Sequence, residues 1–190
     1  MEKFFHEDKL FQNLLYSGKE TKNREFENCT FNNCDFSNGN FTSCKFIDCV
    51  FNNCNFTMTK LTNTQLNNIL FKDCKLLGVN FSNTSDFLFG VKFEGGVLDY
   101  AIFVKKKLHK TMFNKTSIKS ADFTDADLTK SIFSESDLLN SVFYNTNLKE
   151  VNFSTAINFI IDPEINNLKK TIFSLHGISG LLNKYDIIIE

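Results

Sequence analysis

Large apolar side chains recur at every fifth position over most of the chain. From Phe26 to Phe56 each of these positions is phenylalanine, and the spacing continues with leucine or phenylalanine as far as Phe81. After a shift of two residues it resumes at Leu88 and runs to Phe153. A period of five fits neither the 3.6-residue period of a helix nor the two-residue period of a half-buried strand. It indicates a repeat architecture.

Residues twenty positions apart match in type after the shift, which predicts a coil of four five-residue sides. One column of the second half is leucine and the next is phenylalanine: Leu88, Leu108, Leu128 and Leu148, then Phe93, Phe113, Phe133 and Phe153. Stacked coils lie about 4.8 Å apart, so outward residues twenty apart should also meet. The expected amide ladders are Asn32 with Asn52 and Asn33 with Asn53, and the expected ion pairs are Lys105 with Asp125, Lys107 with Asp127 and Lys115 with Glu135.

A second, small position lies two residues before each large one. All the cysteines of the chain occupy it: Cys29, Cys34, Cys44, Cys49, Cys54 and Cys74. No C-x2-C pair occurs, although a tetrahedral zinc site usually shows one, and a reduced thiol is a compact hydrophobe. The cysteines are therefore predicted to be structural thiols, with no metal site.

Two places break the pattern. Over about residues 82–90 two extra residues predict a bulge at a corner, with Leu88 inside and Phe87 and Phe89 pointing outward by alternation. The alternative is that both rings fold back and plug the corner. Lys106 occupies a small inward position, where a charge is costly. Either the coil loosens there, or Lys106 reaches out past its neighbours.

The large-small pairing resembles the pentapeptide-repeat family, whose unit is written A(D/N)LXX. This resemblance implies an all-β fold, a right-handed quadrilateral parallel β-helix with a short C-terminal helix. We expect an irregular N-terminal cap over 1–25, the β-helix over 26–156, and a last partial coil, a short helix at 174–184 and a strand at 187–189 within 157–190. The tail from Asp162 to Glu190 and the opening YSGKE followed by EFENCTFNNCDF are similar to the Qnr quinolone-resistance and microcin-immunity subgroup.

Composition and charge narrow the function. The 21 basic residues nearly balance the 22 acidic ones, so nothing global favours nucleic acid or an anionic membrane. No apolar run is long enough to span a bilayer, and the acidic N-terminus predicts a cytoplasmic location. The histidines His6, His109 and His176 lie outside any catalytic or metal-binding motif. We expect neither enzymatic activity nor a cofactor.

The subgroup implies a dimeric, DNA-like rod that binds DNA gyrase or topoisomerase IV and protects it from quinolones or peptide toxins. The alternative is an interaction scaffold with another partner. Six lysines between residues 104 and 119, several above the acids of the following coils, favour a loop-based contact over a uniformly acidic one. The expected partner-binding residues are Ser85, Asp86, Phe87, Phe89, Asp122, Asp125, Asp127, Glu135 and Asp137. The expected homodimer interface comprises Leu175, Ile178, Leu181, Leu182, Tyr185, Ile187 and Ile188.

Overall fold

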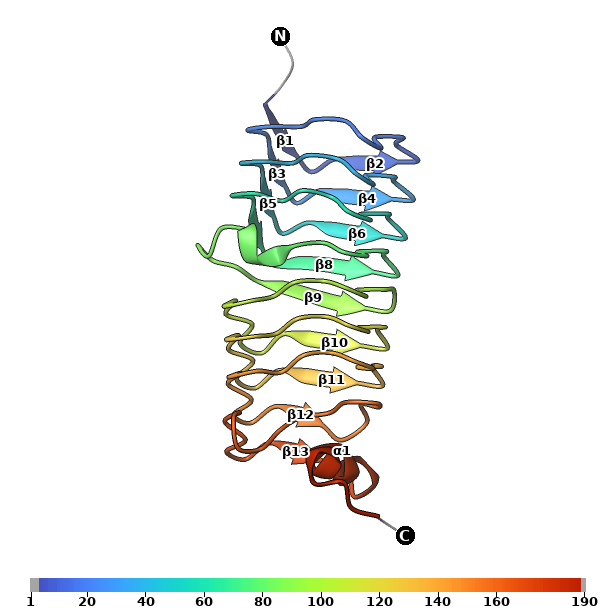
Figure 1. The fold of residues 1–190 in the computed structure, drawn as a ribbon. Coiled ribbons are helices and arrows are strands. Elements are labelled where there is room, and N and C mark those ends of the chain that lie inside the picture. The colour runs from blue at the N-terminus through green and yellow to red at the C-terminus, as the bar shows by residue number, and fades with distance from the viewer. Residues whose placement is uncertain (1–3, 189–190) are drawn as a thin grey trace.

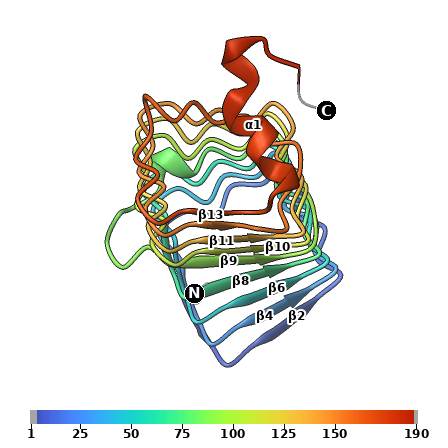
Figure 2. The ribbon, with the colours of Figure 1, turned by 90° about the horizontal axis from the view of Figure 1, so that it is seen from below.

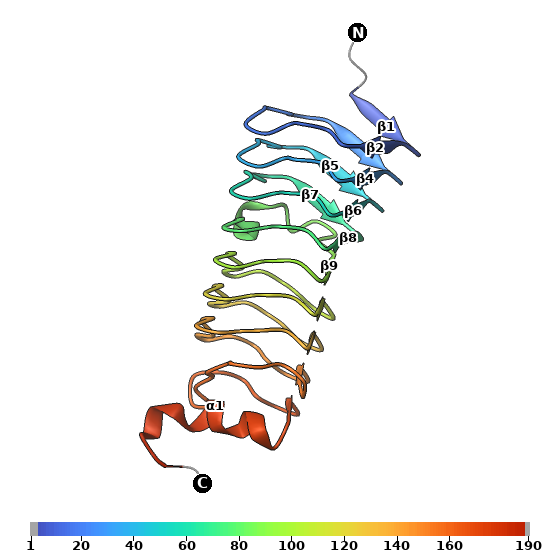
Figure 3. The ribbon, with the colours of Figure 1, turned by 90° about the vertical axis from the view of Figure 1, so that its right-hand side faces the viewer.

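The computed structural model describes residues 4–188 and shows a rod of stacked four-sided coils (Figure 1). All strand pairings are parallel, which gives the β-helix that the five-residue pattern predicts. One side carries a nine-stranded sheet in the order β13-β12-β11-β10-β9-β8-β6-β4-β2, and an adjacent side carries the sheet β1-β3-β5-β7. The first coil and the C-terminal helical segment lie at opposite ends of the rod (Figure 3).

The strands are short because the chain turns a corner after every five residues. The four-stranded sheet comprises β1 (Phe5–Glu7), β3 (Glu25–Glu27), β5 (Lys45–Ile47) and β7 (Gln65–Asn67). The nine-stranded sheet comprises β2 (Leu10–Gln12), β4 (Thr30–Asn32), β6 (Val50–Asn52), β8 (Ile69–Lys72), β9 (Val91–Glu94), β10 (Met112–Asn114), β11 (Ile132–Ser134), β12 (Asn152–Phe153) and β13 (Ile172–Phe173).

The register confirms the twenty-residue coil. Phe31 pairs with Phe51 and Phe113 with Phe133, whereas Phe71 pairs with Phe93 across the insertion, an interval of twenty-two. Each strand of the nine-stranded sheet contributes one inward phenylalanine. Together they form the phenylalanine column: Phe11, Phe31, Phe51, Phe71, Phe93, Phe113, Phe133, Phe153 and Phe173. Consecutive rings stack with centroids 4.5 to 5.6 Å apart, within the range of favourable offset pairs.

The backbone conformation at the corners explains why asparagine and aspartate are frequent at one outward position of the repeat. The residue two positions after an inward side chain has a positive φ, as at Asn28 (50°), Asn53 (51°) and Asp73 (52°). Asparagine and aspartate enter this left-handed region more readily than other non-glycine residues. Two side-chain ladders run beside these corners, from Asn52 Nδ2 to Asn32 Oδ1 at 2.8 Å and from Asn53 Nδ2 to Asn33 Oδ1 at 2.9 Å. Both ladders were predicted.

The small position forms a hydrogen bond to the coil above. Cys44 Sγ donates to the carbonyl of Thr21 at 3.0 Å, and Thr64 Oγ1 donates to the carbonyl of Phe41 at 2.7 Å. Thiol and hydroxyl therefore serve the same purpose at this position. The six cysteines are buried and free, as predicted for structural thiols. Burial raises the pKa of the Cys49 thiol to about 12, which keeps it protonated and unreactive.

The N-terminal segment differs from the irregular cap expected over 1–25. Strands β1 and β2 pair in register with β3 and β4, so coil geometry begins at Phe5. Its inward residues, His6, Phe11, Tyr16 and Thr21, keep the five-residue spacing. The pattern was hidden because His6 and Thr21 are not large apolar residues.

A further coil follows Phe153, since β13 pairs with β12. Three short helices, η2 (His176–Ile178), α1 (Ser179–Leu182) and η3 (Asn183–Tyr185), then cross the end of the rod (Figure 2). Leu181 packs on the core beneath them. The short C-terminal helix was predicted, but residues 187 and 188 do not form the predicted strand. Ile189, its last residue, lies outside the described residues.

Candidate interaction surface

The insertion forms a loop that projects from one corner of the rod (Figure 1). It follows η1 (Phe81–Asn83), and we define it as residues 84–90. Phe87 and Leu88 are 66% and 59% exposed, whereas Phe89 is half-buried and packs on the core. Leu88 therefore does not return inward, which corrects the expected leucine column at this level. Phe87 points outward as alternation predicts, and Phe89 does not.

The ends of the loop are fixed to the coil above. The backbone N–H of Ser85 donates to the carbonyl of Thr64 at 2.9 Å, and that of Gly90 donates to the carbonyl of Leu66 at 2.9 Å. Thr84 is buried, and its hydroxyl donates to the carbonyl of Phe81 at 2.6 Å. The projecting part is thus confined to Asp86 through Phe89.

Lys106 comes from the coil below and is buried against this loop. Its Nζ lies 2.8 Å from Asp86 Oδ1 and 2.9 Å from the carbonyl of Thr84. Burial lowers the pKa of Lys106, and the neighbouring Asp86 carboxylate opposes that shift. Neither alternative for this lysine holds as stated: the coil keeps its regular backbone hydrogen bonds there, and the side chain extends past its neighbours but stays buried. The Lys106 ammonium lies on the interior side of the loop.

The acidic residues of the expected partner surface divide between two corners. Asp122 and Asp127 lie on the sides that meet at the corner of the loop, and Asp125 has a positive φ at that corner. Glu135 and Asp137 lie at the diagonally opposite corner, because the order of sides around the coil separates them. The structure therefore brings Asp122, Asp125 and Asp127 under the loop and places the other two elsewhere.

These carboxylates are largely engaged within the rod. Asp127 Oδ2 lies 2.9 Å from His109 Nε2, and its Oδ1 accepts from Thr129. Although partial burial favours its protonated form, the hydrogen bonds from Thr129 and His109 lower the pKa of Asp127 to about 2. The side-chain partner of Asp127 from the coil above is thus His109 rather than Lys107 as expected.

The other acids show the same behaviour. Lys115 pairs with Glu135 at 3.9 Å, as predicted, and Lys119 pairs with Asp137 at 3.2 Å. Asp125 Oδ1 accepts from Asn145 Nδ2 at 2.6 Å, so the predicted pair with Lys105 is replaced by an amide contact. A negative surface resembling a DNA backbone needs carboxylates free of such partners, and these are mostly paired.

Both signs of charge occur along the side that carries β1, β3, β5 and β7. Above the loop this side presents Glu25 and Glu27, and Lys45 pairs with Glu25 at 3.2 Å. Below the loop it presents Lys107 and Lys130 together with Asp127 and Glu150. The rod is therefore not uniformly negative.

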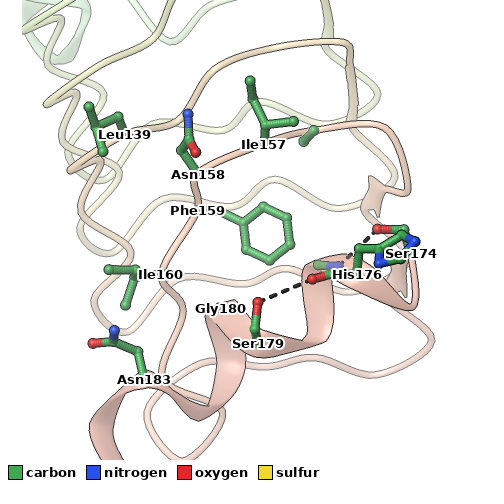
Figure 4. Close-up of a pocket in the computed structure, with 12 residues that line it drawn as sticks. Leu139, Ile157, Asn158, Phe159, Ile160, Ser174, His176, Ser179, Gly180 and Asn183 are labelled. Atoms are coloured by element: carbon green, nitrogen blue, oxygen red, sulfur yellow. Dashed lines mark hydrogen bonds between the residues drawn. The ribbon is translucent and has the colours of Figure 1, made fainter. Parts of the chain in front are cut away.

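The C-terminal end carries a second irregular surface. A groove of about 540 Å³ lies between the last coil and the helical segment, with Ile157 and Ile160 on the coil side and His176 and Asn183 on the helical side (Figure 4). The buried ring of Phe159 closes its floor. Gly177 is needed there, because a Cβ would lie 2.8 Å from the Phe159 ring.

The residues expected at the dimer interface surround this end. Leu175 and Ile188 are 82% and 90% exposed, and Ile178, Tyr185 and Ile187 are also exposed. Leu181 and Leu182 are half-buried. The exposed residues, with Ile157 and Ile160, leave an extensive apolar surface at one end of the rod, which is unusual for an isolated monomer.

Sequence reasoning missed two features of the loop. Leu88 lies at the tip, and no signal in the sequence distinguishes it from the inward leucines. Lys106 was recognised as anomalous, and its position one coil after the insertion was the available signal for its contact with the loop.

Within residues 4–188 no cluster of potential metal ligands is present, and none of the helices could cross a membrane.

Comparison with known families agrees with this architecture. The family model for the pentapeptide repeat region matches residues 24–103, and the model for pentapeptide repeats (8 copies) matches residues 121–157. The chain belongs to the pentapeptide-repeat family. No curated protein sequence matches it.

Solved structures of QnrB1, a plasmid-mediated fluoroquinolone resistance protein, share the fold. A trypsin-treated form is 19% identical with a TM-score of 0.73, and the match covers 98% of this chain and 91% of that chain. Full-length QnrB1 is 20% identical with a TM-score of 0.51, over 94% of this chain and 100% of that chain. At this identity the likeness concerns the fold.

Proposed function

We propose that this chain is a non-enzymatic binding protein that contacts a type II topoisomerase, DNA gyrase or topoisomerase IV, and protects it from quinolones or peptide toxins. The pentapeptide-repeat rod is an interaction scaffold, since its interior is filled by its own columns of side chains. The observation that carries the proposal is a rod like that of QnrB1, a fluoroquinolone resistance protein, with an apolar loop tip at its side.

The loop, rather than an acidic face, is the contact that we propose. Exposed aromatic and apolar side chains commonly anchor protein interfaces, and Phe87 and Leu88 are the exposed apolar residues of the loop. The carboxylates that DNA mimicry would use are paired with His109, Lys115 and Lys119. Asp122, Asp125 and Asp127 lie below the loop and form the polar border of the proposed contact.

The function is tested by supercoiling of relaxed plasmid with purified gyrase, with and without ciprofloxacin. We expect the chain to restore supercoiling in the presence of drug and to leave the drug-free reaction unchanged at the same concentration. The same titration with topoisomerase IV decatenation separates the two enzymes. If neither enzyme is protected at micromolar concentrations, the topoisomerase proposal is wrong, and the scaffold serves another protein.

We further propose a homodimer through the C-terminal end. The exposed side chains of Leu175, Ile178 and Ile188 lie on one end of the rod, and an isologous contact would bury this surface from both copies. Leu175→Glu with Ile188→Glu should convert the dimer to a monomer in sedimentation. Leu15→Glu, at an equally exposed leucine of the first coil, is the matched control. A parent chain that sediments as a monomer would contradict the proposal.

A further inference from the structure

The projecting part of the loop is a turn whose two ends contact the same buried side chain. The backbone N–H of Phe89 points to the carbonyl of Asp86 at 3.4 Å, which closes a four-residue turn with Phe87 and Leu88 in the middle. Lys106 Nζ lies 2.8 Å from Asp86 Oδ1, at the first residue of the turn. It also lies 4.3 Å from the ring centroid of Phe89, at the last residue.

The donors of this ammonium are all used within the loop. Lys106 carries three N–H donors, and Nζ has three oxygen partners, the third being the carbonyl of Ser85 at 3.4 Å. The Phe89 ring adds a cation–π contact, which strengthens when the cation is removed from water. Lys106 is 1% exposed, so these contacts replace its hydration almost completely.

The tip shares the left-handed conformation of the regular corners, where a backbone hydrogen bond to the next coil holds the residue, as from the N–H of Asn28 to the carbonyl of Ile47 at 3.0 Å. Leu88 has a φ of 53°, a left-handed conformation that costs about 1–2 kcal/mol for a residue with a Cβ. Strained backbone persists only where the surroundings over-determine it. The fixed ends, Ser85 and Gly90, and the clamp of Lys106 on Asp86 and Phe89 supply that constraint.

We propose that Lys106 is a positioning residue that presets the Asp86–Phe89 turn as a rigid recognition element for a protein partner with an apolar pocket. Lys106 draws Phe89 inward and thereby leaves Phe87 and Leu88 as the side chains that enter the pocket. The identity of the partner rests on the proposed function, whereas the anchoring of the turn does not. A preformed turn lowers the entropy lost on binding.

Lys106→Met tests the anchor because methionine keeps a long unbranched side chain and removes the charge. The substitution removes the desolvation cost of a buried charge, but it also takes the donor away from the carbonyls of Thr84 and Ser85. These effects oppose each other, so the melting temperature should change by only a few degrees. Hydrogen exchange at the amides of residues 85–89 should nevertheless accelerate about tenfold or more. Lys105→Met, at the neighbouring exposed lysine, is the control and should leave this exchange unchanged.

A second variant keeps the test decisive if Lys106→Met folds poorly. Asp86→Asn retains an acceptor at the exposed end of the clamp and removes its charge. It should accelerate exchange in the same residues, by less than Lys106→Met. Exchange as slow as in the parent chain in both variants would overturn the anchor.

Gyrase protection then separates this inference from the proposed function. If the parent protects gyrase, Lys106→Met should need about tenfold more protein for the same protection, and Lys105→Met should not. Protection by Lys106→Met equal to that of the parent, with faster loop exchange, would overturn the role of a preset turn in recognition. Absence of protection by the parent would refute the topoisomerase proposal, while the exchange measurement would still decide the anchor.

Discussion

Two neighbouring columns of the rod respond differently to the same insertion. The phenylalanine column passes it without a gap, since Phe71 still stacks on Phe93 with centroids 5.6 Å apart. The leucine column, which continues below the loop as Leu108, Leu128 and Leu148, loses its member at this level because Leu88 turns outward. The extra residues are absorbed at one corner, where the strands are short, and the longer ladder between β8 and β9 is preserved.

The comparison teaches that position in the coil, rather than residue type, decides burial. Phe87 and Phe93 are six residues apart, and one is 66% exposed while the other is fully buried. A register slip in the nine-stranded sheet would unstack aromatic rings over many coils. Displacing one leucine at a corner exposes a single side chain, which is the smaller loss.

The sharpest contrast between column and loop comes from a charge placed in each. Phe133→Asp puts an unpaired carboxylate between Phe113 and Phe153. Deleting a buried ring costs about 3–5 kcal/mol, and the buried charge should lower the free energy of unfolding by more than that. Phe87→Asp should change it by less than about 0.5 kcal/mol, as is usual at exposed sites. Urea unfolding measures both. Equal losses would mean that the loop ring is buried.

A milder comparison uses two leucines of the same predicted column. Leu128→Ala should cost about 2–5 kcal/mol, because Leu128 is fully buried. Leu88→Ala should cost less than about 0.5 kcal/mol, because Leu88 is exposed and alanine keeps the Cβ at this positive φ. Thermal unfolding of the two variants gives the order. A cost for Leu88→Ala as large as for Leu128→Ala would mean that Leu88 is buried in the leucine column.

The smallest expected effect concerns the acids below the loop. Asp127 has a folded pKa of about 2 against an ordinary value of 3.8. A lowered carboxylate pKa stabilises the fold above the unfolded value, and this contribution is lost as pH falls from about 4 to about 2. Asp127→Asn should therefore cost about 1 kcal/mol at pH 7, after allowance for solvent screening, and almost nothing at pH 2. A cost independent of pH would mean that the contacts with Thr129 and His109 do not favour the ionised carboxylate.

Most of the fold could be predicted from the sequence because each repeat places its inward residue at a fixed interval. Phe113 over Phe133 and Asn33 over Asn53 follow from counting in twenties. The first coil was missed, because His6 and Thr21 occupy inward positions without the expected residue type. The charge partners were only partly predicted, since Lys107 and His109 both lie within reach of Asp127 and the sequence does not rank them.

The loop shows where counting fails. An insertion of two residues leaves open which residue resumes the inward column, and the five-residue spacing alone placed Leu88 inside. Its true orientation depends on Lys106, which comes from the next coil and clamps Asp86 and Phe89. A contact between a loop and a side chain some twenty residues later is tertiary information, which no local pattern contains.

The most direct test of the loop as the recognition element is gyrase supercoiling in the presence of ciprofloxacin with a paired set of variants. Phe87→Ala with Leu88→Ala removes the exposed tip, and Met112→Ala with Ile132→Ala removes two exposed apolar side chains from another side of the rod. We predict that the parent and the Met112/Ile132 variant restore supercoiling, whereas the Phe87/Leu88 variant does not, although its melting temperature is nearly unchanged. Full protection by the Phe87/Leu88 variant would contradict the account.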